Sequence, residues 1–266
     1  MVKPPTAPVH QARSLRGQGL TDAAAWNWYW RRGRSGALPR RANPNVHWSG
    51  RLLRRAVRTA SARNAFELGC APGAWLAFCA LRLGLAVSGC DASATGIRVA
   101  RALLESAGVS DADVLEADVF ALPSSLQGRY DLVYSFGLIE HFTDLSRILR
   151  AHAVACRPGG VVLVTAPNLC GASGAIYRCA SRTLLRSHRI VTPEQLRSSA
   201  RSAGLVPIAL GYGGPLSAFV LLDRTEGPAR RAAGWLACAA LGWGTLPATS
   251  ERFAGWAWML AERKGP

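Results

Sequence analysis

The stretch "FELGCAPGAWL", residues 66–76, decides the fold. An acid and two glycines lie in a short turn between two apolar runs, and the second run has the composition of a helix. Glycine lets the backbone approach a ligand closely, and the N-terminus of a helix offers N–H groups that the helix leaves unbonded. The stretch therefore predicts a strand, a ligand-binding turn and a helix, in that order.

The chain continues this alternation of strand and helix up to residue 168. Amphipathic runs predict helices over residues 74–84, 94–108 and 145–160, the last of which should end at Pro158 and Gly159. Short apolar strands between helices are typical of a parallel sheet covered on both faces. The predicted strands are "NAFELGC", "AVSGCDAS", "ADVLEADV", "YDLVYSFG" and "VVLVTAPN".

The N-terminal part differs in composition from this region. Residues 1–20 are rich in Pro, Gly and Arg, whereas residues 21–33 contain Trp26, Trp28 and Trp30 and predict a short aromatic helix. Residues 36–47 predict a loop and residues 49–63 an amphipathic helix. We therefore expect an extension over residues 1–48 and the main domain over residues 49–266.

The strand–helix rhythm breaks after residue 168. We expect a helical insertion near residues 168–192, a helix over 192–204 that is capped by Thr192, and an apolar helix over 229–244. Two further strands are predicted over residues 205–214 and 255–263.

The net charge of +16 raises the question of a nucleic-acid partner. Lysine occurs only at Lys3 and Lys264, so nearly all of the 32 basic residues are arginines. With abundant alanine and glycine, this preference is typical of a GC-rich bacterial genome, so part of the charge is compositional. Nucleic acid is therefore not the partner that we expect.

Cysteine usage and hydropathy indicate where the protein works. The seven cysteines are odd in number and include no C-x-x-C pair, which favours reduced thiols in a cytoplasmic protein. No signal peptide is evident at the N-terminus, and the apolar run 232–247 is short for a membrane-spanning helix and contains three glycines. A peripheral membrane contact through residues 229–247 stays open.

Acidic residues at the ends of successive strands indicate the ligand. Glu67 precedes the glycine turn, where its charge would repel a pyrophosphate, and the G-x-G-x-x-G spacing of dinucleotide sites is absent. Asp91 ends the second predicted strand, where a ribose diol needs an acceptor, and Asp118 ends the third, where an adenine amino group can be bound. Three such acids favour a cationic nucleoside, S-adenosylmethionine.

The motifs "ELGCAPG", "GCDAS", "EADVF", "YDLVYSFGLIEHF" and "RPGG" resemble those of class I S-adenosylmethionine-dependent methyltransferases in order and spacing over residues 50–165. The resemblance implies an α/β Rossmann-like fold, with a doubly wound sheet of seven strands whose last strand is antiparallel. Its cofactor is S-adenosyl-L-methionine, and the implied cofactor-binding residues are Glu67, Gly69, Cys70, Gly73, Asp91, Ala92, Asp118, Val119 and Ser135.

Candidate acceptor-site residues follow the fourth predicted strand and lie in the insertion. Methyl transfer to oxygen requires removal of a proton, and His141 in "SFGLIEHF" is the base that we predict, with Glu140 beside it. In related small-molecule enzymes the insertion covers the acceptor, so the resemblance places Tyr177 and His188 in the substrate pocket. The aromatic helix is a candidate lid.

The same segment resembles the O-methyltransferases of quinone biosynthesis and the small-RNA 3′-end methyltransferases. In both, a Glu-x-x-Glu-His run helps to hold a divalent metal. Gly137 occupies the first Glu position here, so we predict no metal.

Three other functions remain as alternatives. An RNA methyltransferase would need another catalytic set, because the Lys-Asp-Lys-Glu tetrad of the ribose 2′-O enzymes lacks its lysines here. A nicotinamide-dependent Rossmann oxidoreductase conflicts with the glycine spacing. A non-catalytic nucleoside-binding module would bind the cofactor without methyl transfer. The sequence favours methylation of a small-molecule acceptor at a hydroxyl of a bacterial metabolite, sugar or lipid-linked intermediate.

Overall fold

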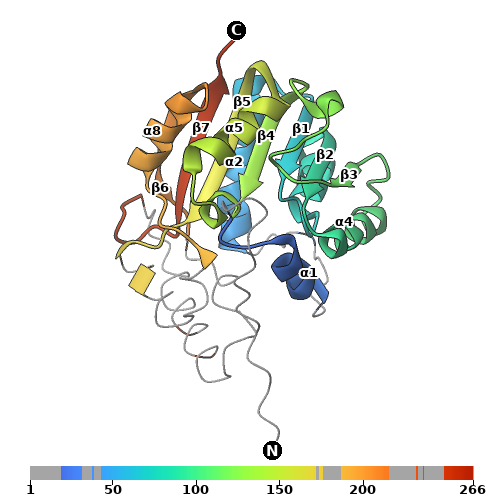
Figure 1. Ribbon diagram of the computed structural model, residues 1–266, viewed down its shortest axis with the longest axis horizontal. Helices are drawn as coiled ribbons and strands as arrows, with labels where there is room; N and C mark the ends of the chain where they lie inside the picture. The colour runs from blue at the N-terminus through green and yellow to red at the C-terminus, as the bar shows by residue number, and fades with distance from the viewer. Residues whose placement is uncertain are drawn as a thin grey trace, which may run out of the picture.

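A mixed seven-stranded sheet forms the centre of the computed structural model, which describes residues 19–31, 38, 43–171, 174, 175, 187–215, 232, 236 and 249–265 (Figure 1). The strand order is β3-β2-β1-β4-β5-β7-β6. The strands are β1 Asn64–Leu68, β2 Ala86–Asp91, β3 Asp113–Glu116, β4 Tyr130–Phe136, β5 Cys156–Pro167, β6 Leu205–Gly213 and β7 Trp256–Arg263.

Strands β1 to β5 are parallel, and β7 runs antiparallel to both of its neighbours. Leu260 of β7 pairs with Leu163 of β5 on one side and with Ala209 of β6 on the other. The seven-stranded doubly wound sheet and its antiparallel last strand confirm the fold expected from the sequence.

Helices cover both faces of this sheet (Figure 1). Leu149 of α5 and Leu196 of α8 share a buried cluster with Val133 on one face. Leu53 of α2 and Leu76 of α3 share the other buried cluster. The helices are α1 Ala23–Arg31, α2 Pro44–Ala60, α3 Ala74–Leu83, α4 Ala94–Ser106, α5 Leu145–Ala155 and α8 Pro193–Ser202, with short 3-10 turns η1 Ser124–Leu126 and η2 Ile139–His141.

The boundary between α5 and β5 corrects one sequence prediction. We expected a helix as far as Pro158 and Gly159, but α5 ends at Ala155 and β5 begins at Cys156. Cys156 has extended dihedral angles, φ −70° and ψ 140°. Proline disfavours helical geometry in the residue before it, which is Arg157 here, and its ring cannot continue a helix. The sheet therefore gains a longer fifth strand.

Helix α2 begins earlier than the sequence suggested. Residues 44–47 were expected in a loop, yet the helix starts at Pro44. The Asn43 side chain accepts a hydrogen bond from the backbone N–H of Asn45, and Pro44 occupies the first helical turn, where it needs no N–H partner. The expected boundary between residues 48 and 49 falls inside this helix, and the division of the chain into an extension and a main domain remains a proposal.

The region after β5 is described only in part. Helix α8 has the expected cap. The Thr192 hydroxyl accepts a hydrogen bond from the N–H of Gln195, and the Gln195 side-chain oxygen accepts one from the N–H of Thr192. Most of the 168–192 insertion and of the apolar run 229–247 lies outside the described residues. Among the residues that are described, no helix is both long and apolar enough to cross a membrane.

Candidate functional site

The turn between β1 and α3 holds the two glycines of the opening motif in left-handed backbone conformations. Gly69 has φ 70° and Gly73 has φ 88°. The N–H groups of Gly69 and Cys70 donate to the carbonyl oxygen of Cys90 over 2.8 and 3.0 Å, so the turn is fixed against the end of β2. A Cβ at Gly73 would lie 3.1 Å from the backbone of Ala100. Glycine at this position therefore allows close packing of α3 on α4.

Glu67 lies beneath this turn and is almost fully buried. The hydroxyl of Tyr134 donates to its Oε2 over 3.2 Å. Burial raises the pKa of the Glu67 carboxyl well above its ordinary value, although bonds from Tyr134 and from the N–H of Leu76 oppose that shift. Its carboxyl group thus stands at the first turn of α3, where a cationic ligand group would stabilise its charge.

Asp91 joins the two loops that carry the cofactor motifs. Its Oδ1 accepts from the N–H of Ser93 over 2.8 Å, and its Oδ2 accepts from the N–H of Ala71 over 3.2 Å. Burial raises the pKa of Asp91, while both backbone bonds lower it. Ala92 follows with partial exposure, next to the start of α4.

The third acidic position lies just beyond β3. The N–H of Ala117 donates to the Asp91 carbonyl over 3.0 Å, which brings this segment beside the end of β2. Asp118 is exposed and accepts from the N–H of Phe120 over 2.9 Å, whereas the Val119 side chain is buried in the core. Asp91 and Asp118 therefore lie along one edge of the sheet, as the sequence suggested.

The Ser135 hydroxyl points into the core. We predicted a cofactor contact for this residue, and its fully buried hydroxyl bonds to Nε2 of His152 in α5 over 2.9 Å. Side chains alternate between the faces of a strand, and this one points to the α5 face. Because the hydroxyl is bonded to His152, only the backbone of Ser135 can contact a ligand at the end of β4.

The turn after β4 positions the candidate base. His141 ends the short turn η2 and is 4% exposed. Its Nδ1 lies 2.9 Å from the carbonyl oxygen of Ser187, an acceptor, so Nδ1 carries the proton and Nε2 carries the lone pair. Burial and the neighbouring His188 lower the pKa of His141 well below its ordinary value. The ring is therefore neutral near pH 7, with Nε2 able to accept a proton.

Glu140 and His188 meet beside His141. Nε2 of His188 lies 4.0 Å from Oε1 of Glu140, and Nδ1 of His188 lies 2.9 Å from the Ser187 hydroxyl. Oε2 of Glu140 is buried and bonds to no described residue. Burial raises the pKa of Glu140 to about 8. The structure thus brings together three predicted site residues, whereas Tyr177 lies outside the described residues.

Donor atoms of Glu140, His141 and His188 lie within 4.8 Å of one another, so we tested whether they fit the metal of the related enzymes. The fourth donor position is Gly137, whose φ of 69° disfavours any side chain. A Cβ built there would lie 3.4 Å from Oε1 of Glu140. Gly137 therefore supplies no side-chain donor, so the first Glu of the Glu-x-x-Glu-His run has no counterpart here, and no step of the reaction is assigned to a metal.

Two contacts near this site were not predicted from the sequence. The amide oxygen of Asn27 in α1 accepts from the Ser93 hydroxyl over 2.8 Å, and the Trp26 ring lies edge-on to His141 with centroids 5.0 Å apart. The aromatic composition of α1 indicated a lid, but nothing in the sequence showed which residues it would contact.

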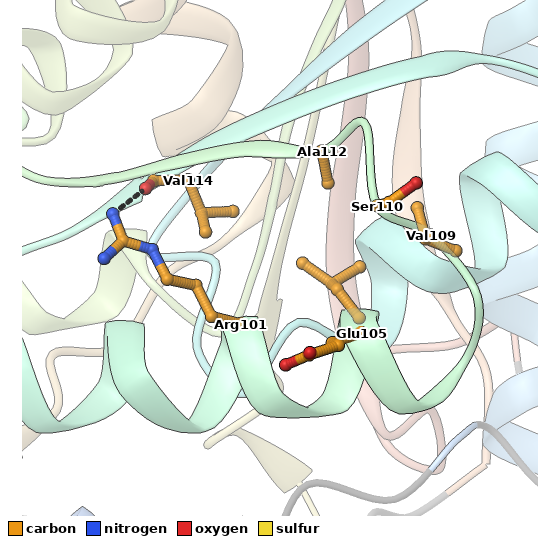
Figure 2. A pocket seen from close by; sticks show the side chains of 7 residues that line it. Arg101, Glu105, Val109, Ser110, Ala112 and Val114 are labelled. Atoms are coloured by element: carbon orange, nitrogen blue, oxygen red, sulfur yellow. Dashed lines mark hydrogen bonds between the residues drawn. The ribbon is translucent and has the colours of Figure 1, made fainter.

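A separate hollow of about 340 Å³ lies beside the loop that leads from α4 into β3. Figure 2 shows side chains that line it. Arg101 crosses it to donate to the carbonyl oxygen of Val114 over 2.7 Å. The hollow is far from the strand ends that carry the acids, and it contains none of the predicted site residues.

The fold is that of a Rossmann-like α/β protein, and its strand-end acids lie at the carboxyl edge of the sheet, where such folds bind their ligands. Residues 65–160 match the family model described as a methyltransferase domain. Over these residues the chain is similar to methyltransferase domains, and its sheet has the strand arrangement expected from the resemblance to class I S-adenosylmethionine-dependent methyltransferases.

Curated relatives are bacterial. The chain is 32% identical over 148 residues to a ubiquinone biosynthesis O-methyltransferase of Methylobacterium sp. (strain 4-46), covering 53% of this chain and 58% of the relative. It is 29% identical over 158 residues to the enzyme of the same name from Bordetella pertussis, covering 56% and 65%. The chain thus spans about three fifths of the length of these relatives.

Solved structures support the fold alone. Phosphoethanolamine N-methyltransferase 2 of Haemonchus contortus, in complex with S-adenosyl-L-methionine, aligns with a TM-score of 0.59 at 18% identity, covering 92% of this chain and 58% of that one. The [4+2]-cyclase SpnF aligns with a TM-score of 0.58 at 20% identity, covering 87% and 88%. The same fold therefore serves reactions of different classes.

Proposed function

We propose that this protein transfers the methyl group of S-adenosylmethionine to a hydroxyl of a small-molecule acceptor. Two independent features support the proposal. The cofactor edge carries Glu67, Asp91 and Asp118, and the curated bacterial relatives are named as O-methyltransferases. The observation that carries it is His141, a buried neutral imidazole at the end of β4 whose Nε2 bears the lone pair.

The cofactor site fits a cationic nucleoside. The N–H groups of Ala71, in the turn after β1, and of Ser93, in the loop after β2, already hold the Asp91 carboxylate. It therefore needs little reorganisation to bind a ribose diol. Buried carboxyl groups with raised pKa values favour a ligand that brings positive charge, because that charge stabilises their ionised forms. When bound, S-adenosylmethionine supplies a methyl group that passes from its sulfur to the acceptor oxygen, leaving S-adenosylhomocysteine.

His141 performs the proton step. Its Nε2 accepts the proton of the acceptor hydroxyl as the new oxygen–carbon bond forms. The Ser187 carbonyl stabilises the resulting imidazolium, because it accepts the Nδ1 proton. Trp26 packs edge-on against the ring and limits its rotation. Glu140 and His188 line the same space, and we propose that they contact the acceptor.

The described thiols support a cytoplasmic location, which we also propose. Cys70, Cys79, Cys90 and Cys156 are buried thiols that form no disulfide among the described residues. Free thiols of this kind persist in a reducing compartment.

Calorimetry with S-adenosylhomocysteine and NAD tests the cofactor assignment. We expect heat from the first ligand and none from the second, and the opposite result would contradict the proposal in favour of an oxidoreductase. A screen with labelled S-adenosylmethionine over extracts of the source organism then tests the acceptor. Label in a small molecule at oxygen is expected. Label in RNA supports the RNA alternative, and cofactor binding with no transfer supports a binding module.

A further inference from the structure

Residues 19–31, called the strap below, cross the carboxyl edge of the sheet as one segment. The first end of the strap is attached beside the acceptor site. Gly19 pairs with Phe142 in an antiparallel bridge, and the N–H of Leu20 donates to the carbonyl oxygen of His141 over 2.7 Å. Helix α1 forms the other end and packs on α4, beside which it lies in Figure 1.

Asn27 connects the strap to the cofactor loop. Its Oδ1 accepts from the Ser93 hydroxyl over 2.8 Å and from the N–H of Thr95 over 3.0 Å. Ser93 is fully buried and caps α4 by accepting from the N–H of Gly96. The N–H of Ser93 donates to Oδ1 of Asp91, so a chain of hydrogen bonds runs from Asn27 to the proposed ribose acceptor.

The end of α1 fits closely against the start of α4. A Cβ at Gly96 would lie 3.0 Å from Nε1 of Trp30 and 2.8 Å from the Cβ of Ala71. Gly96 therefore lies between Trp30 of the strap and Ala71 of the glycine turn after β1. A shift of α1 would disturb this close packing at the start of α4.

Trp26 faces the acceptor side. Consecutive residues of a helix project about 100° apart, so Trp26 and Asn27 point in different directions from the same turn. The Trp26 ring meets His141 edge-on at 5.0 Å, and its Nε1 donates to the Thr21 hydroxyl over 3.2 Å. One helical turn thus contacts the proposed base and the cofactor loop at once.

We propose that the strap is part of the active site, with Asn27 as a positioning residue for the cofactor loop and Trp26 as the contact that links it to His141. Cofactor binding at Asp91 then orders the acceptor side through the strap. This inference rests on the proposed function, because it assigns the cofactor to Asp91.

Cofactor affinity tests the role of Asn27. Asn27→Ala removes an acceptor used by two donors, and we expect S-adenosylhomocysteine to bind about 10-fold more weakly by calorimetry. Asn27→Asp keeps an acceptor oxygen and places negative charge at the N-terminus of α4, which is favourable, so it should bind within about threefold of the wild type. Thr192→Ala is the matched control, since it removes the cap of α8, which packs on β6, several strands away from β2 and Asp91.

Hydrogen exchange tests the coupling. In the wild type, S-adenosylhomocysteine should slow exchange in peptides that cover residues 19–22 and 138–142, and in Asn27→Ala it should not at saturating ligand. Equal ligand affinity in Asn27→Ala and wild type would overturn the positioning role. The positioning role would also be overturned if Thr192→Ala weakened ligand binding as much as Asn27→Ala does. The same conclusion would follow if Asn27→Asp bound the ligand as weakly as Asn27→Ala. Unchanged protection of residues 138–142 in the wild type would overturn the coupling. A wild type that binds no S-adenosylhomocysteine would instead refute the proposed function itself.

Discussion

Nδ1 of His141 lies 2.9 Å from the carbonyl oxygen of Ser187, which is 46 residues further along the chain. This one contact selects the tautomer of the ring and leaves Nε2 as the proton acceptor. Because Ser187 lies in the segment after β5, the base is oriented by the part of the chain that the sequence assigned to the acceptor site.

His141→Ala should lower kcat by about 100-fold or more while S-adenosylhomocysteine still binds, because the variant loses the proton acceptor and leaves Asp91 in place. His47→Ala, on the exposed face of α2, is the control and should retain full turnover. Steady-state kinetics with a labelled methyl donor measure both. Full turnover of His141→Ala across pH 6–9 would remove the residue from its proposed role.

The pH profile of the wild type follows from the direction of the His141 shift. Its lowered pKa keeps the ring neutral at pH values where an ordinary histidine, with a pKa of about 6.5, becomes charged. We therefore expect protonation of the base to lower kcat/KM only below about pH 6.5. A fall centred near pH 6.5 or above would indicate a different base.

Asp91→Asn should weaken binding of S-adenosylhomocysteine about 10-fold or more, because an amide offers one acceptor where the carboxylate serves two N–H groups and a ribose. Asp113→Asn changes an exposed acid at the start of the neighbouring strand β3 and should bind normally. Calorimetry at constant pH compares them. Similar affinities for the two variants would argue that the ribose lies elsewhere.

Glu140 should make stability depend on pH in a defined direction. Its folded pKa of about 8 exceeds the ordinary value of 4.5, so the unfolded chain ionises first and stability is lost as pH rises between those values. Glu140→Gln should therefore gain stability relative to the wild type from pH 5 to pH 8, by at most about 4 kcal/mol. Urea unfolding at both pH values measures the difference. Glu105→Gln, at an exposed site, should show no such trend.

Gly73→Ala should destabilise the protein by about 2 kcal/mol and weaken cofactor binding. The change places a side chain at φ 88° and 3.1 Å from the Ala100 backbone. Gly84→Ala is the matched control, because Gly84 also has a positive φ but has no atom within 4 Å of an added Cβ. It should cost about 1 kcal/mol without affecting the cofactor. Equal losses in both variants would show that close packing at Gly73 is unimportant.

The sheet was predictable because its signals are local. Apolar strands and the Thr192 cap each depend on a few neighbouring residues, and every predicted strand is present, although β3 is shorter and β5 longer than expected. The end of α5 was wrong by several residues, because the helix-forming run before Pro158 outweighed the effect of proline on the residue that precedes it. Helix α2 was shortened because Asn43 was not recognised as its cap.

The candidate site was predictable only in its residue types. The motif residues indicated an acidic cofactor edge, but the partners of those residues come from distant segments. Asn27 meets Ser93 across 66 positions and Ser135 meets His152 across 17, and neither pair leaves a periodic pattern in the sequence. Such contacts depend on tertiary packing, which no local motif encodes.

The position of β7 between β5 and β6 has a consequence for synthesis on the ribosome. Until residues 256–263 leave the exit tunnel, β5 and β6 both present unpaired backbone edges, which are templates for pairing with other nascent chains. Strands β1 to β4, by contrast, have all of their neighbouring strands once β5 has been made. We therefore expect this protein to rely on chaperones late in translation, at strands β5 to β7 and not at strands β1 to β4.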